Sequence, residues 1–514
     1  MTEEIELKLA LAPDDVGRLR RHEVLRALKN GPVATRRLVS VYFDTPDFAL
    51  RRKKVVLRIR HIGTKRIQTL KQDPLPGRSA LVRGEWETPV TADRPELDRI
   101  GNAKLRALVA PQFDGDAMRD VFVTDIQRTV WPLKLGRNEI ACMLDIGEIR
   151  ANGRRQPVCE LELELALGGR AALFRLARQI NRTLPLRVAR VTKAERGYLL
   201  AAGRTPESEA KAGATHLDPG MSVAAAFTAI ARGATDHILA NVDSASAGKN
   251  PEGVHQLRVG IRRLRNAFSL FRDVVPARGG AALARELRWL QQQLGPAREW
   301  DALLSETLTP ATADLDLGQG LRPLRRAAEQ RRQVAYGQSR AVLCERRYSD
   351  LLLRLEAWFD ALAAMAESNP PRADGASAVL LIRFAAATLT QRASRVEKLG
   401  RKMHKIDDAE LHKLRIRVKK LRYASEFFHD LWPGKATKRY IVALKSLQDS
   451  LGLAHDALIA VGLIRTLAAD AGKKAAPAAR RVLAWNATRL ERERKTLIRL
   501  WHRFAATDPF WTGD

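Results

Sequence analysis

The sequence predicts an α+β protein with more than one domain: a β-rich N-terminal region forming a barrel or sandwich, then an all-α C-terminal region built from a duplicated unit. Three observations support this prediction. Short runs with strand-like alternation fill roughly the first two hundred positions, and a small, polar stretch follows them. Beyond it, two helical stretches repeat each other at constant spacing. The length of 514 residues is also too great for one hydrophobic core.

Eight segments of the N-terminal region have the period-2 alternation of β-strands. Gly, Pro, Asn and Asp residues separate them, and helical patterns intervene near residues 14–29 and 170–182. This number of short strands is typical of a barrel or a sandwich. The predicted strands are 5–11, 38–45, 55–62, 66–73, 82–90, 125–133, 139–150 and 158–167.

Composition divides the chain after these strands. Residues 204–220 are small and polar, as in a linker, and strand patterns disappear beyond them. A second break, 368–377, contains Pro, Gly and Asp and divides the helical region. We therefore predict a domain at 1–203, a linker at 204–220 and a helical domain at 221–510, with repeats at about 221–367 and 376–510.

The helical repeat is visible in two pairs of segments. "VHQLRVGIRRLR" (254–265) matches "LHKLRIRVKKLR" (411–422), and "LQQQLGPARE" (290–299) matches "LQDSLGLAHD" (447–456). Both pairs are separated by the same distance along the chain, since 411 − 254 and 447 − 290 both equal 157. The common offset indicates duplication of a unit, which we expect to form two bundles of about four helices each.

Each copy of the basic helix carries a stripe of cations. On a helical wheel His255, Arg258, Arg262 and Arg265 share one face, and apolar residues form another. Neither copy contains an acidic residue that would relieve the repulsion between these cations. The alternative interpretation is that each stripe is simply a solvated outer face. The repetition of the cationic stripe in both copies instead favours binding of an external anion. The candidate ligands are His255, Arg258, Arg262, Arg263, Arg265, His412, Arg415, Lys419, Lys420 and Arg422.

Net charge points to the same class of partner. The chain has 89 Lys and Arg against 58 Asp and Glu, a formal charge of +31, which favours nucleic acid, anionic lipid or polyphosphate. The cysteines, Cys142, Cys159 and Cys344, form no paired motif, so we expect neither disulfides nor zinc. Without a signal-like start or an apolar run of about 18 residues, we predict a cytoplasmic protein with no membrane partner.

Charged residues also alternate with apolar ones along several predicted strands. A half-exposed sheet would explain any one of these strands. If the sheet instead closes with its charged face inward, carboxylates for Mg²⁺ or Mn²⁺ would meet Lys and Arg side chains for phosphate. The residues that share such faces include Glu4, Glu6 and Lys8; Arg58 and Arg60; Arg83, Glu85 and Glu87; and Glu160, Glu162 and Glu164.

The E-x-E-x-K pattern at residues 4–8 is followed by a series of further motifs: "YFDT" (42–45), "LRIR" (57–60), "TLK" (69–71), "RGEWE" (83–87), "LDIGEI" (144–149), "ELELEL" (160–165) and "TKAERGY" (192–198). In this order, the series resembles the CYTH superfamily, the triphosphate tunnel metalloenzymes. The resemblance implies an eight-stranded antiparallel β tunnel with flanking helices that hydrolyses triphosphates with Mg²⁺ or Mn²⁺.

The same resemblance implies roles for individual residues. Carboxylates would bind metal or orient the attacking water, and cations would bind phosphates. Glu148 also sits at a position where the family carries an acid. The implied metal-site residues are Glu4, Glu6, Glu85, Glu87, Asp145, Glu160, Glu162 and Glu164. The implied catalytic cations are Lys8, Arg58, Arg60, Lys71, Arg83, Arg128 and Lys193.

The duplicated H-x-L-R-x-x-[VI]-[RK]-[RK]-L-R pattern resembles the CHAD family, the conserved-histidine α-helical domains. Leu294, Gly295, Arg298 and Glu299 match a second family element. The resemblance covers about 221–505. It implies two pseudo-symmetric four-helix bundles with a basic groove that binds inorganic polyphosphate.

Three functions fit these observations. The first is a metal-dependent triphosphatase acting on inorganic triphosphate, with a helical domain that binds polyphosphate. The second is other triphosphate chemistry in the same tunnel, as in thiamine triphosphatase or adenylate cyclase. The third is a non-catalytic scaffold for polyanions. Nucleic acid is disfavoured as the partner because the cationic stripes have no interleaved aromatic residues for base stacking.

Overall fold

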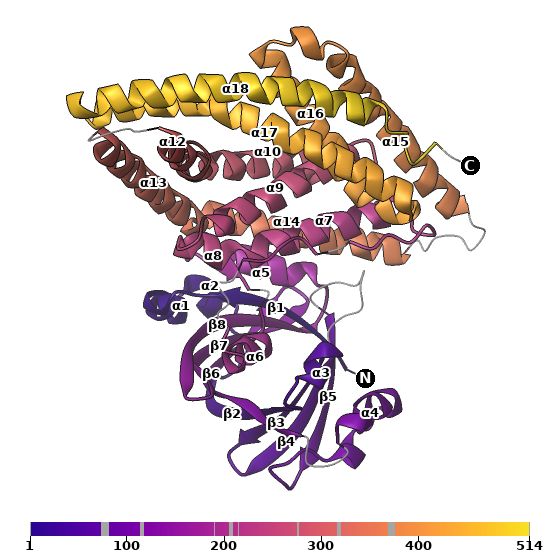
Figure 1. The fold of residues 1–514 in the computed structure, drawn as a ribbon. Coiled ribbons are helices and arrows are strands. Elements are labelled where there is room, and N and C mark those ends of the chain that lie inside the picture. Colours follow the sequence, from indigo (N-terminus) through magenta and orange to yellow (C-terminus); the bar gives the residue numbers. More distant parts are fainter. Residues whose placement is uncertain are drawn as a thin grey trace. The chain divides into compact units, whose positions relative to one another are not determined.

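The computed structural model describes residues 2–72, 82–113, 118–189, 191–204, 209–213, 215–274, 277–315, 320–368 and 376–512. The chain forms two compact units. One contains residues 1–208 and 343–365, and the other contains 209–342 and 366–514. Figure 1 shows a β-rich N-terminal part and a helical C-terminal part, as predicted. The predicted domain limits and linker stay a prediction.

The strands of the first unit form one antiparallel sheet in the order β5-β4-β3-β2-β6-β7-β8-β1-β9. The strands from β5 to β1 in this order close into a barrel, because residues Thr2–Ile5 of β1 also pair with β5. Eight strands therefore enclose a lumen, and the two-residue strand β9 adds to β1. All eight predicted segments form strands, although Leu11 and Thr45 lie just beyond the ends of β1 and β2 and Asp73 lies outside the described residues. The strands are β1 Thr2–Ala10, β2 Ala34–Asp44, β3 Val55–Ile62, β4 Lys65–Gln72, β5 Val82–Val90, β6 Arg119–Leu135, β7 Asn138–Ala151, β8 Arg154–Leu167 and β9 Arg187–Val188.

Alternation along the strands decides which side chains face the lumen. Leu9, Leu161 and Leu163 are fully buried in a core that also contains Leu173 and Leu176 of helix α5 (Ala171–Asn181). A second core joins β2–β4 to α4 (Ala103–Val109). The apolar face of the barrel is thus covered by helices, and the alternate, charged positions face inward.

Helix α6 (Lys193–Ala201) is anchored beside the barrel. The side chain of Thr192 caps it by accepting a hydrogen bond from the backbone N–H of Glu195. Tyr198 packs against Phe122, with ring centroids 5.2 Å apart. These contacts fix the first turn of the helix, which carries Lys193. Further short helices of this unit are α1 Val16–Arg20, α2 Glu23–Ala27 and α3 Ala49–Arg52.

Helix α14 (Arg346–Ser368) belongs to the first unit as far as Met365, although its sequence lies in the predicted first helical repeat. Leu353 is fully buried in the core that contains α5. Asn181 donates a hydrogen bond to the backbone oxygen of Arg346 at 3.0 Å, and Arg178 pairs with Asp350 at 2.8 Å. A segment distant in sequence therefore completes the core of the barrel unit.

The helical unit confirms the duplication. Helices α9 (Pro251–Leu270) and α16 (Asp408–Phe427) have the same length, and their starts differ by 408 − 251 = 157 positions. The long helix α17 corresponds to α10, α11, the π-helical segment η4 and α12 of the first copy. The other equivalent pairs are α7 with α15 and α13 with α18. The bounds are α7 Val223–Ala240, α8 Val242–Ala247, α10 Ala277–Gln293, α11 Gly295–Ala302, η4 Leu303–Leu308, α12 Thr309–Asp314, α13 Leu321–Cys344, α15 Ala376–Gly400, α17 Lys435–Asp470 and α18 Ala476–Ala505.

Each of the repeated basic helices begins at a residue whose side chain caps it. The side chain of Asn250 accepts from the N–H of Glu252 at the start of α9, with Pro251 in the first turn. Asp407 accepts from the N–H of Glu410 at the start of α16. The apolar stripe of each helix is buried: Leu257, Ile261 and Leu264 in α9, and Leu414, Val418 and Leu421 in α16.

Helix α17 has a window of 18 residues with mean hydropathy 1.5, of which 33% is buried. By length and composition it is the one helix among the described residues that could cross a membrane. A single helix of this kind is weak support for a membrane span, because core helices of soluble proteins pass the same test.

Candidate functional site

The register of the closed sheet brings the predicted tunnel residues together. Lys8 lies opposite Glu162, Asp145 opposite Glu160, and Lys71 opposite Glu85. Directly opposed residues point to the same face. Charged positions from strands far apart in sequence therefore line one lumen.

One group of charges is centred on Glu162. Lys193 Nζ donates to Glu162 Oε1 at 2.7 Å and to Glu160 Oε2 at 2.8 Å. Arg128 binds both oxygens of Asp145, at 2.7 and 2.6 Å, and also donates to Glu162 at 2.6 Å. Burial alone would raise the pKa of Glu162, but Lys193, Lys8 and Arg128 outweigh it and hold that pKa well below its usual value.

A second group joins strands β1, β4 and β5. Lys71 Nζ lies 2.7 Å from a Glu4 oxygen and 3.1 Å from a Glu85 oxygen. Lys8 Nζ lies 2.6 Å from Glu6 Oε1 and 3.4 Å from Glu162 Oε1. The lysines thus stand between carboxylates that would otherwise repel one another.

Glu164 lies near other carboxylates and forms no ion pair within the described part of the chain. Burial, followed by the charges of Glu4, Glu6 and Glu85, raises the pKa of Glu164 to about 7. A hard divalent cation would relieve this repulsion and accept oxygen ligands, so these side chains fit Mg²⁺ or Mn²⁺. Among the described residues, no three carboxylate, histidine or cysteine side chains are already gathered as a metal site.

Arg60 has the opposite surroundings. Burial, followed by the charges of Arg58 and Arg128, lowers the pKa of Arg60 to about 10. Arg60 donates to the hydroxyl of Ser40 at 3.4 Å, and within the described part of the chain it forms no ion pair with a carboxylate. Arg58, in contrast, lies 3.3 Å from Glu85 and 3.9 Å from Glu87. An anion in the lumen would therefore find Arg60 available.

The structure places nearly all of the predicted tunnel residues in this lumen. The side chain of Arg83 lies outside the described residues. Glu148 instead pairs with Arg150, at 3.1 Å. Sequence reasoning missed Arg196, which donates to Glu160 at 2.6 Å and to the backbone oxygen of Pro157 at 2.5 Å. Its signal was its position three residues after Lys193, on the same side of a helix.

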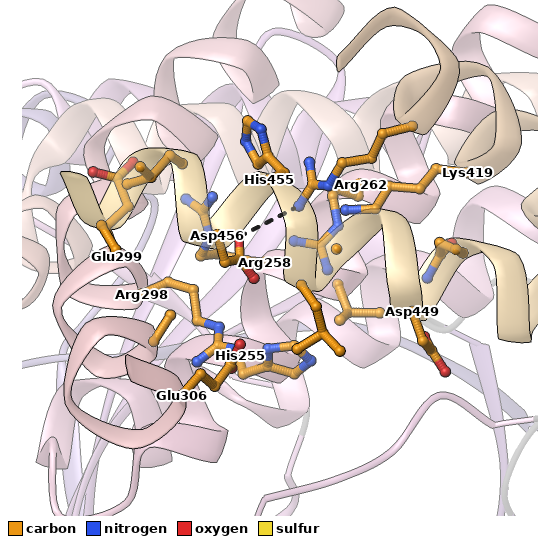
Figure 2. A pocket seen from close by; sticks show the side chains of 18 of the residues that line it. His255, Arg258, Arg262, Arg298, Glu299, Glu306, Lys419, Asp449, His455 and Asp456 are labelled. Atoms are coloured by element: carbon orange, nitrogen blue, oxygen red, sulfur yellow. Dashed lines mark hydrogen bonds and ion pairs between the residues drawn. The ribbon is translucent and has the colours of Figure 1, made fainter. Parts of the chain in front are cut away.

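In the helical unit, α9, α11, η4, α16 and α17 surround a cavity of about 570 Å³, which we call the first cavity. Figure 2 shows cations and carboxylates converging on it. Sequence reasoning missed Glu306, Asp449 and His455, which stand among these residues. The predicted ligands that line the first cavity are His255, Arg258, Arg262, Arg415, Lys419 and Arg422.

A second cavity of about 670 Å³ adjoins the first. Arg262, Arg415, Lys419 and Tyr423 line both cavities. Two further predicted ligands, Arg265 and Lys420, line only the second.

The other two predicted ligands have different surroundings. Arg263 donates to Glu426 at 2.8 Å and lies over the ring of Phe427. His412 is exposed, and its Nδ1 lies 3.3 Å from Nδ1 of His455. Neither lines the two cavities, and their assignment as ligands stays a prediction.

Cations crowd the first cavity beyond what its carboxylates balance. Burial, then Arg415 and Arg262, lowers the pKa of Lys419 to about 6. Burial, then Arg298 and Arg262, lowers the pKa of His255 to about 4. Burial, with Arg262 next, lowers the pKa of Arg258 to about 10. Such unrelieved repulsion favours binding of an anion, which would restore the charged forms.

The fold and both sites define a class of protein. A closed antiparallel β tunnel with a charged lumen is joined to a duplicated helical unit with a basic groove, by which we mean the first cavity. Residues 2–198 match the family model of the CYTH domain, and residues 229–465 match that of the CHAD domain. The chain therefore contains a CYTH domain followed by a CHAD domain. Both resemblances seen in the sequence are confirmed.

Known proteins resemble both parts. An inorganic triphosphatase of Haemophilus influenzae is 31% identical over 204 residues, which cover 39% of this chain and 55% of that protein. An uncharacterized protein of Mycobacterium tuberculosis is 27% identical over 415 residues, 76% of each chain. The crystal structure of the CHAD domain of Ricinus communis has a TM-score of 0.50 at 30% identity and covers 57% of this chain and 96% of that domain. The chain thus spans about half the length of the triphosphatase that it resembles.

Proposed function

We propose that the protein is a metal-dependent triphosphatase that hydrolyses inorganic triphosphate in its tunnel and binds inorganic polyphosphate in its helical groove. The observation that carries the proposal is the division of charge inside one closed lumen. Glu164 stands among carboxylates, whereas Arg60 stands among cations. A substrate that combines phosphates with a divalent cation matches both environments.

Individual residues then take separate tasks. Arg60, Arg58 and Lys71 would neutralise phosphate oxygens, and Arg128 and Lys193 would hold Asp145 and Glu162 in their charged forms. A negative carboxylate near the bound phosphates can orient water and accept its proton. The closed barrel restricts entry of bulk water and strengthens these interactions.

Glu4, Glu6, Glu85 and Glu164 are the residues that would hold Mg²⁺ or Mn²⁺, with Glu87, Glu160 and Glu162 as further acidic groups. When bound, the cation would neutralise phosphate charge and polarise the reacting bond. The chain's own part is to supply oxygen ligands and to keep lysines close enough to compensate them when no cation is bound.

Inorganic triphosphate is the proposed substrate because the N-terminal region is similar to an inorganic triphosphatase. The basic groove supports the same choice, since a neighbouring polyphosphate-binding unit suits a substrate made only of phosphate. The groove's lowered pKa values, above all that of Lys419, support a polyanion as its ligand.

The test is a panel of substrates for the purified full chain. Released phosphate is measured for inorganic triphosphate, thiamine triphosphate, ATP and long-chain polyphosphate, with Mg²⁺ and with Mn²⁺, and cyclic AMP is measured in the ATP reactions. Preferential hydrolysis of inorganic triphosphate supports the proposal. Cyclic AMP as the main product, preference for thiamine triphosphate, or no turnover with either metal would refute it.

A further inference from the structure

The second cavity of the helical unit differs from the first in its chemistry. The first is lined by the carboxylates Glu299, Glu306, Asp449 and Asp456 as well as by cations. No Asp or Glu is found among the described residues that line the second, although seven Lys and Arg residues do so. Within the described ranges, the wall of the second cavity therefore provides no carboxylate to balance its positive charge.

The second cavity also has an apolar surface. Phe268, Ala281, Ala284 and Ile416 line it, supplied by α9, α10 and α16. Its volume of about 670 Å³ lies within the range of roughly 300–1,000 Å³ typical of small-molecule sites. A chain made only of phosphate would leave this apolar surface without a partner.

Two buried polar atoms of residues in its wall have no hydrogen-bond partner in the part of the chain that the structure describes. Asn266 is 6% exposed, and its oxygen accepts a hydrogen bond from Arg392 at 2.8 Å. Because this contact fixes the orientation of the amide, Nδ2 is left as a buried donor, and it has no hydrogen-bond partner among the described residues. The buried Nε of Arg415 also has no hydrogen-bond partner among the described residues. A buried donor without a partner costs free energy. Because both nitrogens expose almost no surface, a ligand atom would reach them only after their side chains shift, and the case for a ligand rests on the charge and the apolar surface of the cavity.

We propose that the second cavity is a separate site for a phosphorylated organic molecule such as a nucleotide. Its apolar part packs against Phe268, Ala284 and Ile416. Its phosphates extend to Arg262, Arg415 and Lys419, which the two cavities share. The second site thus recognises what inorganic phosphate chains lack, and the shared wall lets their phosphates compete.

The experiment is photolabelling of the full chain with 8-azidoadenosine triphosphate in EDTA, followed by mapping of the labelled peptides. Mapping separates the second cavity from the tunnel, which is elsewhere in the sequence. EDTA prevents the proposed metal-dependent turnover. The result is therefore independent of whether the tunnel hydrolyses triphosphate.

Two substitutions in the second cavity and one control in the first test the location. Ala284→Trp fills the second cavity from α10. Gly452→Trp is the matched control, because it enlarges a residue of the first cavity where an added Cβ would meet no atom within 4 Å. Arg288→Glu, an exposed position of the second cavity, is a further variant that places no bulk in the interior.

We expect label on peptides from α10 and α16 that ATP suppresses more strongly than equimolar inorganic triphosphate. Ala284→Trp and Arg288→Glu should reduce it at least about fivefold, while Gly452→Trp changes it less than about twofold. The proposal fails if these peptides carry no label, if Ala284→Trp and Arg288→Glu retain it, or if inorganic triphosphate competes as well as ATP.

Discussion

Arg422 donates a hydrogen bond to the side-chain oxygen of Gln448 at 2.8 Å. The equivalent residues of the first repeat, Arg265 and Gln291, make the same contact at 2.6 Å. Each pair joins the basic helix to the following helix of its own repeat. The duplication thus extends to the contacts that position these arginines. This indicates the same structural requirement in both repeats.

The lowered pKa of Lys419 leads us to expect that polyphosphate binding depends on pH. Arg415 and Arg422 on its own helix, Arg262 on α9 and Asp456 on α17 surround its amine, and the pKa is lowered to about 6. The amine is therefore mostly neutral at pH 7 in the free protein, whereas a bound polyanion favours the charged form. Binding should take up a proton, and affinity should increase as the pH falls toward 6.

Calorimetry in two buffers of different ionisation enthalpy measures this proton uptake directly. Lys419→Arg is the control, because guanidinium stays charged and its uptake on binding should be smaller. Equal proton uptake by the wild type and Lys419→Arg would show that another group is responsible.

We expect substitution of Arg60 to reduce catalysis without reducing the stability of the fold. Arg60→Met removes a buried cation that lacks a carboxylate partner among the described residues, so kcat/KM for triphosphate should fall by about 10²-fold. The melting temperature should be unchanged or higher because repulsion from Arg58 and Arg128 is relieved. Steady-state phosphate release and thermal unfolding provide the two readouts.

Arg37→Met is the matched control. Arg37 pairs with Asp125 on the surface, where such pairs contribute little to stability. Its kcat/KM should stay at the wild-type value. An unchanged kcat/KM in Arg60→Met would remove Arg60 from the phosphate site.

Removal of divalent cations should abolish turnover but leave the barrel folded. In the proposed mechanism Glu164 and its neighbours hold the cation that catalysis requires, whereas Lys71 and Lys8 already compensate Glu4 and Glu6 for stability. Phosphate release should stop in EDTA and return with excess Mg²⁺ or Mn²⁺, and circular dichroism should change little. Turnover that persists after exhaustive chelation would contradict the proposed metal site.

Leu353 predicts that α14 stabilises the tunnel unit. Leu353→Ala leaves a cavity in the core shared with α5 and should cost about 2–5 kcal/mol. Val334→Ala, at a position that is 59% exposed, should change stability by less than about 0.5 kcal/mol. Denaturant unfolding followed by hydrogen exchange in β1, β8 and α5 measures the effect. Equal protection of these segments in both variants would mean that α14 is dispensable there.

Much of the fold could be predicted because alternation is a local property of the sequence. The strand that contains Glu160, Glu162 and Glu164 is easily predicted because a leucine follows each of these glutamates. Strand β9 has only two residues, too few for any period to appear. The packing of α14 against α5 depends on long-range contacts that no local pattern encodes.

The candidate sites were predicted where a stripe or a strand face sets direction. The helical wheel placed Arg258 and Arg262 on one face, and both line the first cavity. Arg263, the next residue, points to Glu426, because consecutive helical residues diverge by about 100°. Asp449 and Glu306 were missed because they reach the cavity from other helices.

The central claim is a division of labour between the tunnel and the groove, and one paired measurement on the full chain tests it most directly. Triphosphate hydrolysis and long-chain polyphosphate affinity are measured for Glu162→Gln and for Arg262→Glu with Lys419→Glu. Glu162→Gln should lower hydrolysis at least about 10²-fold with unchanged polyphosphate affinity, and the groove variant should do the reverse. Loss of the same activity in both variants would contradict the account.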